Sequence, residues 1–320
     1  MTYLQEPPKL SESEVSYSVQ EYYGLEGTLH LLPGDRDQNF LLKSPEGQKH
    51  VVKVSSLDEV HEILEFETEM ITRLSNDTNG LIPSVIPAIS GASLITHENQ
   101  HGQHYRLRIL EFLPGTLLAK INPRPDALLM NLGERMAELG SVLGAYPDHP
   151  PPRINFEWAL GQAGNIMEKS LSVLDSPRRA LIELTLKDFR DNEREFLGLG
   201  SQIIHGDVND HNVLDSLNEE NHARISGIID LGDAHSAPRV FDLAIAIAYG
   251  ILGTADPLLA ASEITRGYYA EQPLLEIEIN VLLTLVCARL GQSVCIASLR
   301  RHHGDTDPYH LISEAGAWKT

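Results

Sequence analysis

Residues 203–215 read IIHGDVNDHNVLD, a segment that begins with the apolar pattern of a buried strand and then turns abruptly polar. It places Asp207, Asp210 and Asn212 within a few positions of one another. Crowded carboxylates repel each other and lose solvation when they are covered, so a fold keeps them where water, a cation or a substrate balances the charge. Two interpretations follow: a solvated turn or a catalytic loop.

A second apolar run, ISGIIDLGD at 225–233, ends at Asp230. Mg²⁺ prefers oxygen ligands in octahedral geometry and is commonly bound by one or two carboxylates together with substrate phosphates. Asn212 and Asp230 have suitable side chains for that role. An ionised Asp207 can accept the proton of a hydroxyl that attacks a γ-phosphorus in line. The two segments therefore predict a candidate site for metal-assisted phosphoryl transfer.

Lys53 lies upstream, in the strand-like run VVKV at 51–54. Its apolar neighbours would fix the base of the side chain, and an ammonium group in such a strand needs an anionic partner. Glu67, in the helical pattern that follows, is the expected partner, and the pair would hold Lys53 extended toward nucleotide phosphates. Glu65 and Glu69 lie beside the apolar stripe and are weaker candidates.

Turn signals and apolar periodicity predict a small β-rich lobe followed by a larger, mainly helical lobe. The first lobe should contain a short helix that begins at Ser11, three antiparallel strands, a long helix and a further hairpin. These elements are expected at 11–24, 27–34, 37–44, 48–55, 56–75, 89–97 and 104–115. From about residue 116 the apolar spacing is mostly helical. The expected domains are residues 1–112 and 113–320.

Taken together, HGDVNDHN, IIDLGD, VVKV and FETEM resemble the aminoglycoside phosphotransferase and choline kinase superfamily, small-molecule relatives of protein kinases. The resemblance spans nearly the whole chain. PGDRDQNFLL, HGDVNDHNVL and IIDLGDAHSAPRVFDLAIAIAY are most similar to the hydroxylysine kinase branch, which phosphorylates an amino alcohol with a purine nucleoside triphosphate. The resemblance implies an α+β, protein-kinase-like fold of two lobes.

The same resemblance implies roles for individual residues. Asp207 would be the catalytic base, and Asn212 and Asp230 would bind Mg²⁺. Lys53 and Glu67 would position the phosphates of ATP or GTP. In addition, Asp242 resembles a structural acid at the start of the next helix.

The donor site would include the loop between the first two strands, LLPGDRDQNF, which has a single glycine and is therefore not the glycine-rich cover of a protein kinase. Backbone amides from Gly34 to Asn39 are expected near the phosphates. In LEFLPG at 110–115, backbone groups of Glu111 to Leu113 are expected to pair with the purine edge. Adenine and guanine are not distinguished by these residues.

The acceptor is expected to be a small alcohol that carries an amine, because acidic side chains lie near the predicted base. Asp210 and Asp233 are the candidates for binding its ammonium group, with His211 and Trp158 as neighbours. Each has a structural alternative: the two acids can cap backbone amides, and the tryptophan can be a core residue.

Composition narrows the function classes. The chain has 45 acidic and 25 basic side chains, a formal charge of -20, which disfavours nucleic acids and anionic membranes as partners. The N-terminus lacks the basic and apolar regions of a secretory signal, so a cytoplasmic protein is expected.

Alternative functions are a catalytically silent nucleotide-binding module that regulates a partner, a protein kinase, or a kinase for homoserine or an aminoglycoside. The sequence carries no signal for oligomeric state.

Overall fold

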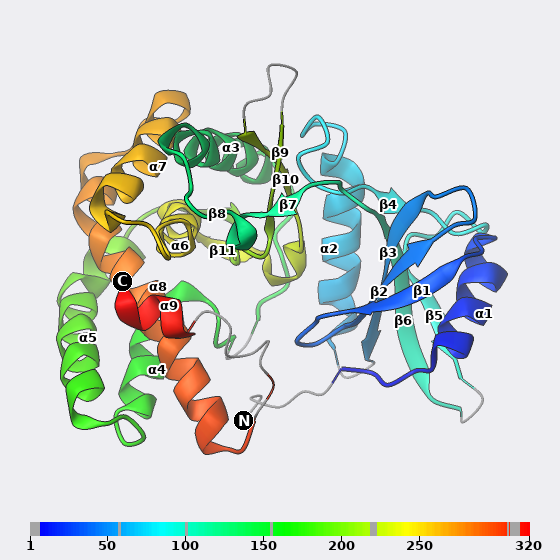
Figure 1. The fold of residues 1–320 in the computed structure, drawn as a ribbon, viewed down its shortest axis with the longest axis horizontal. Helices are drawn as coiled ribbons and strands as arrows, with labels where there is room; N and C mark the ends of the chain where they lie inside the picture. The colour runs from blue at the N-terminus through cyan, green and yellow to red at the C-terminus, as the bar shows by residue number, and fades with distance from the viewer. Residues whose placement is uncertain are drawn as a thin grey trace. The chain divides into compact units, whose positions relative to one another are not determined.

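The fold is shown in Figure 1 as a computed structural model, which describes residues 7–56, 59–99, 102–153, 156–217, 223–305, 307 and 314–320. The chain forms two compact units, Met1–Leu113 and Pro114–Thr320. The division lies one residue from the boundary expected after residue 112.

Antiparallel strands form the sheet of the first unit, in the order β1-β2-β3-β6-β4, with β5 also paired to β6. The strands are β1 (Thr28–Leu32), β2 (Gln38–Lys43), β3 (Lys49–Ser56), β4 (Val85–Ile86), β5 (Ile95–Glu98) and β6 (His104–Glu111). The predicted three-stranded meander and the following hairpin are therefore confirmed. Short polar turns after β1 and β2 permit this direct antiparallel connection.

The two faces of this sheet differ in polarity because side chains alternate along each strand. Apolar residues such as Phe40 and Val52 point to one face, where they form a core with helix α1 (Glu12–Tyr23). On the other face lie charged residues and helix α2 (His61–Leu74), whose Glu67 reaches Arg108 of β6. Figure 1 shows the two helices on opposite sides of the sheet.

The first helix begins and ends as its sequence predicts. Ser11 and Glu14 form a reciprocal capping box at the N-terminus of α1. Gly24 follows the last turn with φ 65°, a left-handed conformation that glycine adopts without a steric penalty.

The second unit is mainly helical and carries two small sheets. Its strands are β7 (Thr116–Leu117), β8 (Ser201–Ile204), β9 (Val213–Leu217), β10 (Ala223–Ile228) and β11 (His235–Pro238), ordered β10-β9-β7 and β11-β8. Its helices are α3 (Asp126–Gly144), α4 (Ala163–Ser170), α5 (Ser176–Leu197), α6 (Val240–Gly250), α7 (Pro257–Glu271), α8 (Glu276–His302) and α9 (Glu314–Lys319). Three-residue 3₁₀ helices occur at Leu118–Lys120, Leu160–Gln162 and Leu231–Asp233.

The core of the second unit is built around α6 and α8. Every residue of α6 is buried. Helix α8 is long and apolar enough to cross a membrane, but 72% of its most apolar window is buried inside the protein, where it contacts α4, α5 and α6. Its composition is therefore that of a central core helix.

Helices α3 and α7 cross at two glycines. A Cβ atom built on Gly133 of α3 would lie 1.9 Å from the carbonyl oxygen of Ile264, and one on Gly267 of α7 would lie 1.9 Å from that of Met130. Such distances are far below van der Waals contact, so any side chain at these positions would force the helices apart.

We expect Gly133→Ala to lower the free energy of unfolding by about 1–3 kcal/mol, the usual cost of overpacking a core. Urea denaturation of the purified protein measures the change. The matched control is Gly140→Ala on the same helix, where an added Cβ meets no heavy atom closer than 3.8 Å. The control should be stabilised by about 0.5–1 kcal/mol, since alanine favours a helix interior over glycine. Equal stability changes in the two variants would contradict the close-crossing argument.

Candidate active site

The loop that follows β8 is held by a buried carboxylate. Asp242, in the first turn of α6, accepts hydrogen bonds from the backbone N–H groups of His205 at 2.7 Å and Gly206 at 2.8 Å. Burial raises the pKa of Asp242, while His205 and the two backbone donors act in the opposite direction. Gly206 has φ 80°, and a Cβ there would lie 2.6 Å from the carbonyl oxygen of Asp233. The loop therefore needs both the acid and the glycine.

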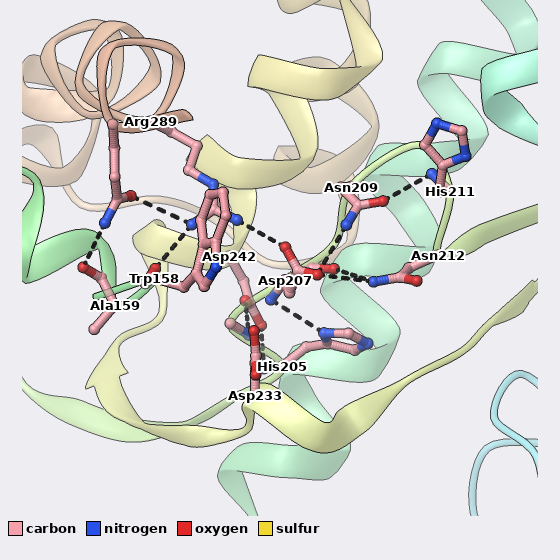
Figure 2. Close-up of polar contacts among 12 residues, drawn as sticks. Trp158, Ala159, His205, Asp207, Asn209, His211, Asn212, Asp233, Asp242 and Arg289 are labelled. Carbon is pink, nitrogen blue, oxygen red and sulfur yellow. Dashed lines mark hydrogen bonds and ion pairs between the residues drawn. The ribbon is translucent and has the colours of Figure 1, made fainter. Parts of the chain in front are cut away.

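Asp207 follows immediately, and its carboxylate receives hydrogen bonds on both oxygens (Figure 2). Arg289 donates to Oδ1 from Nη2 at 2.7 Å. Asn209 and Asn212 donate to Oδ2 from their side-chain amides at 2.8 and 3.0 Å. The side chain of Asp207 remains 23% exposed, so the carboxylate is oriented by the protein yet accessible.

The protonation of Asp207 is set by opposing influences. Burial raises its pKa to about 6, and the nearby charge of Asp233 raises it as well. Arg289, His205 and the hydrogen bond from Asn209 lower it. A general base is most effective when its pKa lies near the working pH, and the raised pKa moves this carboxyl from its ordinary value toward neutrality.

The two predicted metal ligands are brought together by the backbone. The N–H of Ile229 donates to the carbonyl oxygen of Asn212 at 2.8 Å, which places Asp230 beside Asn212. Asp230 is exposed and adopts left-handed φ 65° and ψ 70°, a conformation that is uncommon for residues other than glycine, asparagine and aspartate. Because the Asn212 amide nitrogen donates to Asp207, its Oδ1 is the atom suited to bind a cation.

These oxygen donors fit Mg²⁺, which binds oxygen ligands and keeps part of its shell for phosphates and water. Within the described part of the chain, no group of three or more His, Cys, Asp and Glu side chains forms a metal site. A cation at Asn212 and Asp230 would thus take its remaining ligands from a bound nucleotide and solvent.

The candidate acceptor residues differ in how the structure places them. Arg124 donates from Nη2 to Oδ2 of Asp210 at 2.7 Å, and both side chains are buried. From Nη1 the same guanidinium donates to the carbonyl oxygens of Tyr249 and Gly250 at the end of α6. The predicted contact of Asp210 with a substrate ammonium is therefore not supported, because the acid already has a cationic partner and connects the loop to α6.

His211 is also placed away from the site, since Figure 2 shows its ring pointing away from Asp207. Asp233 is buried, and its charge acts on Asp207. Trp158 is half-buried, and its ring lies 4.9 Å from the guanidinium carbon of Arg289. The predicted contacts of Asp233, Trp158 and His211 with an acceptor remain predictions.

Sequence reasoning did not identify Arg289 as a site residue. It lies in the middle of α8, and its only signal in the sequence is a single arginine within an apolar helical run. A charge at such a position requires a partner inside the protein, but the sequence does not reveal which one.

In the first unit, the charged face of the sheet carries a cluster of four ionised side chains. Lys53 and Arg108 are opposite each other on β3 and β6. The Lys53 ammonium lies 3.3 Å from Oδ2 of Asp37, and Arg108 Nη2 lies 3.4 Å from the same oxygen. Arg108 also donates to both carboxylate oxygens of Glu67, at 3.0 and 2.9 Å.

The predicted partnership of Lys53 with Glu67 is therefore corrected by the structure, which pairs Glu67 with Arg108 and Lys53 with Asp37. A planar guanidinium matches both oxygens of a carboxylate, whereas an ammonium group does not. Arg108, with a side chain only 1% exposed, takes this position on the helix-facing side of the sheet. Neither Asp37 nor Arg108 was identified from the sequence, although Arg108 lies in a strand whose neighbouring residues are apolar.

The loop between β1 and β2 is braced by its own residues. Asn39 donates from its side-chain amide to the carbonyl oxygen of Pro33 at 3.2 Å. A Cβ on Gly34 would lie 2.4 Å from the carbonyl oxygen of Asp37, so only glycine fits this turn. The loop also brings Asp37 to Lys53. Its predicted phosphate contacts remain a prediction.

At the end of β6, part of the expected purine-binding segment already forms hydrogen bonds within the protein. The N–H of Glu111 donates to the carbonyl oxygen of Ser84 at 2.8 Å, so this donor is not available to a base. The Glu111 carboxylate accepts a hydrogen bond from the Ser84 hydroxyl at 2.8 Å. Leu113 is half-buried at the end of the first unit.

Comparison with known proteins agrees with the chemistry that the candidate site suggests. The phosphotransferase enzyme family matches residues 28–274. The chain is similar to hydroxylysine kinase of Danio rerio, with 31% identity over 303 residues, or 91% of this chain and 84% of the relative. Hydroxylysine kinase of Mus musculus is 28% identical over 98% of this chain and 88% of the relative.

Solved structures confirm the predicted kinase-like α+β fold. An amicoumacin kinase in complex with AMP-PNP and Ca²⁺ has a TM-score of 0.70 at 14% identity, with 97% of this chain and 92% of that chain covered. A microcompartment-associated aminopropanol kinase has a TM-score of 0.70 at 17% identity, with coverage of 96% and 94%. The GDP complex of an aminoglycoside 2′-phosphotransferase has a TM-score of 0.68 at 16% identity, with coverage of 96% and 98%.

We expect Arg108→Met to lower the free energy of unfolding by about 3–5 kcal/mol, because it leaves Glu67 and Asp37 with less compensation for buried negative charge. Urea denaturation checks this value. The control is Arg106→Met on the same strand, whose side chain makes exposed contacts with His61 and Thr96 and should cost less than about 1 kcal/mol. A small effect of both substitutions would show that the cluster contributes little to stability.

Proposed function

Because the chain belongs to the phosphotransferase enzyme family, we propose that it transfers the γ-phosphoryl group of ATP or GTP to a hydroxyl of a small amine-bearing metabolite, hydroxylysine or a related amino alcohol. The enzyme class itself, a phosphotransferase with an alcohol group as acceptor, agrees with the relatives named hydroxylysine kinase. The observation that carries the proposal is the accessible carboxylate of Asp207, oriented by hydrogen bonds from Arg289, Asn209 and Asn212.

The choice of acceptor is supported by the relatives and by local charge. The curated relatives are named for hydroxylysine, and one structural neighbour is named as an aminopropanol kinase, so amino alcohols recur among the names. In this chain Asp233 adds negative charge close to Asp207. A negative site favours an ammonium group on the acceptor. Trp158 offers an aromatic face, which also attracts cations.

The chemical step follows from these positions. The acceptor oxygen forms a bond to the γ-phosphorus while the bond between that phosphorus and the β,γ-bridging oxygen breaks. The electron pair of the broken bond remains on the departing nucleoside diphosphate. Asp207 accepts the proton of the hydroxyl, a contribution of about 10²- to 10⁴-fold for a well-placed base. Orientation of the two reactants supplies much of the remaining rate enhancement.

Asn212 and Asp230 would hold Mg²⁺, which when bound neutralises negative charge on the phosphate oxygens. Lys53 would bind phosphates of the donor, with Glu67 and Arg108 stabilising the sheet face from which it extends. Backbone amides from Gly34 to Asn39 would contribute further contacts to the phosphates.

Purine recognition is assigned to the segment from Glu111 to Leu113. Since the Glu111 N–H already donates to the carbonyl oxygen of Ser84, the Leu113 N–H is the donor proposed for the purine. Structures of the neighbours include a complex with AMP-PNP and one with GDP, so both purines remain in the proposal. We also propose a cytoplasmic location, because nucleoside triphosphates are available there.

A coupled nucleotide-consumption screen tests the function. The protein is supplied with Mg²⁺, with ATP or GTP, and with a panel that contains hydroxylysine, other amino alcohols, homoserine and an aminoglycoside. We expect acceptor-dependent turnover with an amino alcohol. Asp207→Asn should reduce turnover by about 10²- to 10⁴-fold and leave nucleotide affinity nearly unchanged. Nucleotide binding without transfer to any acceptor would instead indicate a silent regulatory module.

The pH dependence of kcat/KM gives a second test. Burial raises the pKa of Asp207 to about 6, so the base becomes protonated as the pH falls through that value. We expect kcat/KM to fall on the acid side with a midpoint near pH 6, and this limb to be absent from the residual activity of Asp207→Asn. The control is Asp191→Asn, an exposed acid on α5, which should retain the wild-type profile. A flat wild-type profile down to pH 5 would exclude Asp207 as the titrating base.

A further inference from the structure

Arg289 is an enclosed cation. Its side chain is 0% exposed, and its guanidinium carbon lies 4.9 Å from the ring centroid of Trp158 and 5.4 Å from that of Tyr249. Aromatic faces stabilise a cation but do not replace an anionic partner in a low-dielectric interior. The anionic partner is Asp207, at 2.7 Å. Oδ1 of Asp207, the proposed base, is therefore bound to a guanidinium group that is fixed in the core.

The same turn of α8 also holds the segment that carries Trp158. Arg289 donates from Nη1 to the carbonyl oxygen of Trp158 at 2.8 Å. Gln292, one turn further along the helix, donates to the carbonyl oxygens of Glu157 at 2.6 Å and Ala159 at 3.0 Å. Three successive carbonyl groups are thus bound by two neighbouring side chains of one helix. Figure 2 shows this chain of contacts leading from Ala159 to Arg289 and on to Asp207.

The hydrogen bonds on Asp207 leave a definite place for a substrate. An ionised carboxylate has about four lone-pair positions, two on each oxygen. Asn209 and Asn212 donate to Oδ2, and Arg289 donates to Oδ1. Among the interactions of the described residues, the second lone pair of Oδ1 is the position that these donors do not fill. A hydroxyl that gives its proton to Asp207 would then approach the oxygen that Arg289 holds.

We propose that Arg289 is a positioning residue of the phosphoryl transfer: it holds Oδ1 of Asp207 at a set place relative to the Glu157–Ala159 segment, and so determines where the acceptor hydroxyl can lie. This role rests on the proposed function. Arg289 does not touch the acceptor, because its guanidinium is fully enclosed. Without it, Oδ1 loses its only charged donor among these contacts, and the carboxylate can rotate away from the orientation needed for attack.

A double-mutant cycle tests the proposal with the wild-type chain, Arg289→Met, Asp207→Asn and the double variant. For each, kcat, acceptor KM and the nucleotide dissociation constant are measured on the folded protein with Mg²⁺. We expect Arg289→Met to lower kcat by about 10²-fold, the cost of misplacing a reacting group by about 1 Å, with nucleotide affinity unchanged. In the Asp207→Asn background the same substitution should lower kcat by less than about 3-fold, since residues that act as a unit are not additive.

Two further variants separate positioning from stability. Arg239→Met is the matched control, because Arg239 and Glu278 form a comparable ion pair at 2.7 Å between the starts of α6 and α8. It should leave kcat unchanged. Arg289→Lys keeps the charge but cannot bridge Asp207 and the Trp158 carbonyl oxygen as a guanidinium does, so an intermediate kcat is expected. If Arg289→Met does not fold, the cycle is run with Arg289→Lys.

The outcomes are distinguishable. Equal loss of kcat in both backgrounds, or an unchanged kcat in Arg289→Met, overturns the positioning role alone. A similar loss in Arg239→Met would assign the effect to general stability and overturn it as well. A wild-type chain that transfers phosphate to no acceptor overturns the proposed function, and this inference with it.

Discussion

The candidate active-site loop of the second unit depends on one buried carboxylate. Asp242 accepts the backbone N–H groups of His205 and Gly206, and it does so from the first turn of a helix that is buried along its whole length. Because α6 cannot shift without disturbing the core, it supports the loop after β8 rigidly. Asp207 follows this support directly, so its main-chain position is held by contacts other than those of its own side chain.

Buried arginines orient acidic side chains within each of the two units. Arg289 binds Asp207, Arg124 binds Asp210, and in the first unit Arg108 binds Glu67. Each pair removes two charges from water, and breaking one would leave an uncompensated charge inside the protein. This constraint explains why Asp210 is paired with Arg124, although its sequence position close to Asp207 made it a candidate for binding the substrate. Proximity along the chain did not decide its partner.

Much of the fold followed from local patterns. The capping box from Ser11 to Glu14, the turns between the first three strands and the apolar stripe of α2 all appear where the sequence predicted them. The buried strand before Asp207 and the apolar run that ends at Asp230 were predicted in the same way. These features depend on residues that are neighbours in sequence, so propensity and periodicity are sufficient to find them.

The sequence by itself determined which chemical groups the protein has and in which elements they lie: a carboxyl after a buried strand, an amide a few residues on, and a lysine within a sheet. Only the tertiary structure decided the partners of the charged groups. Arg289 and Asp207 are 82 positions apart, Arg124 and Asp210 are 86 apart, and Arg108 and Glu67 are 41 apart. A buried charge pairs with the opposite charge that packing brings to hydrogen-bond distance, and that depends on the placement of whole helices and strands.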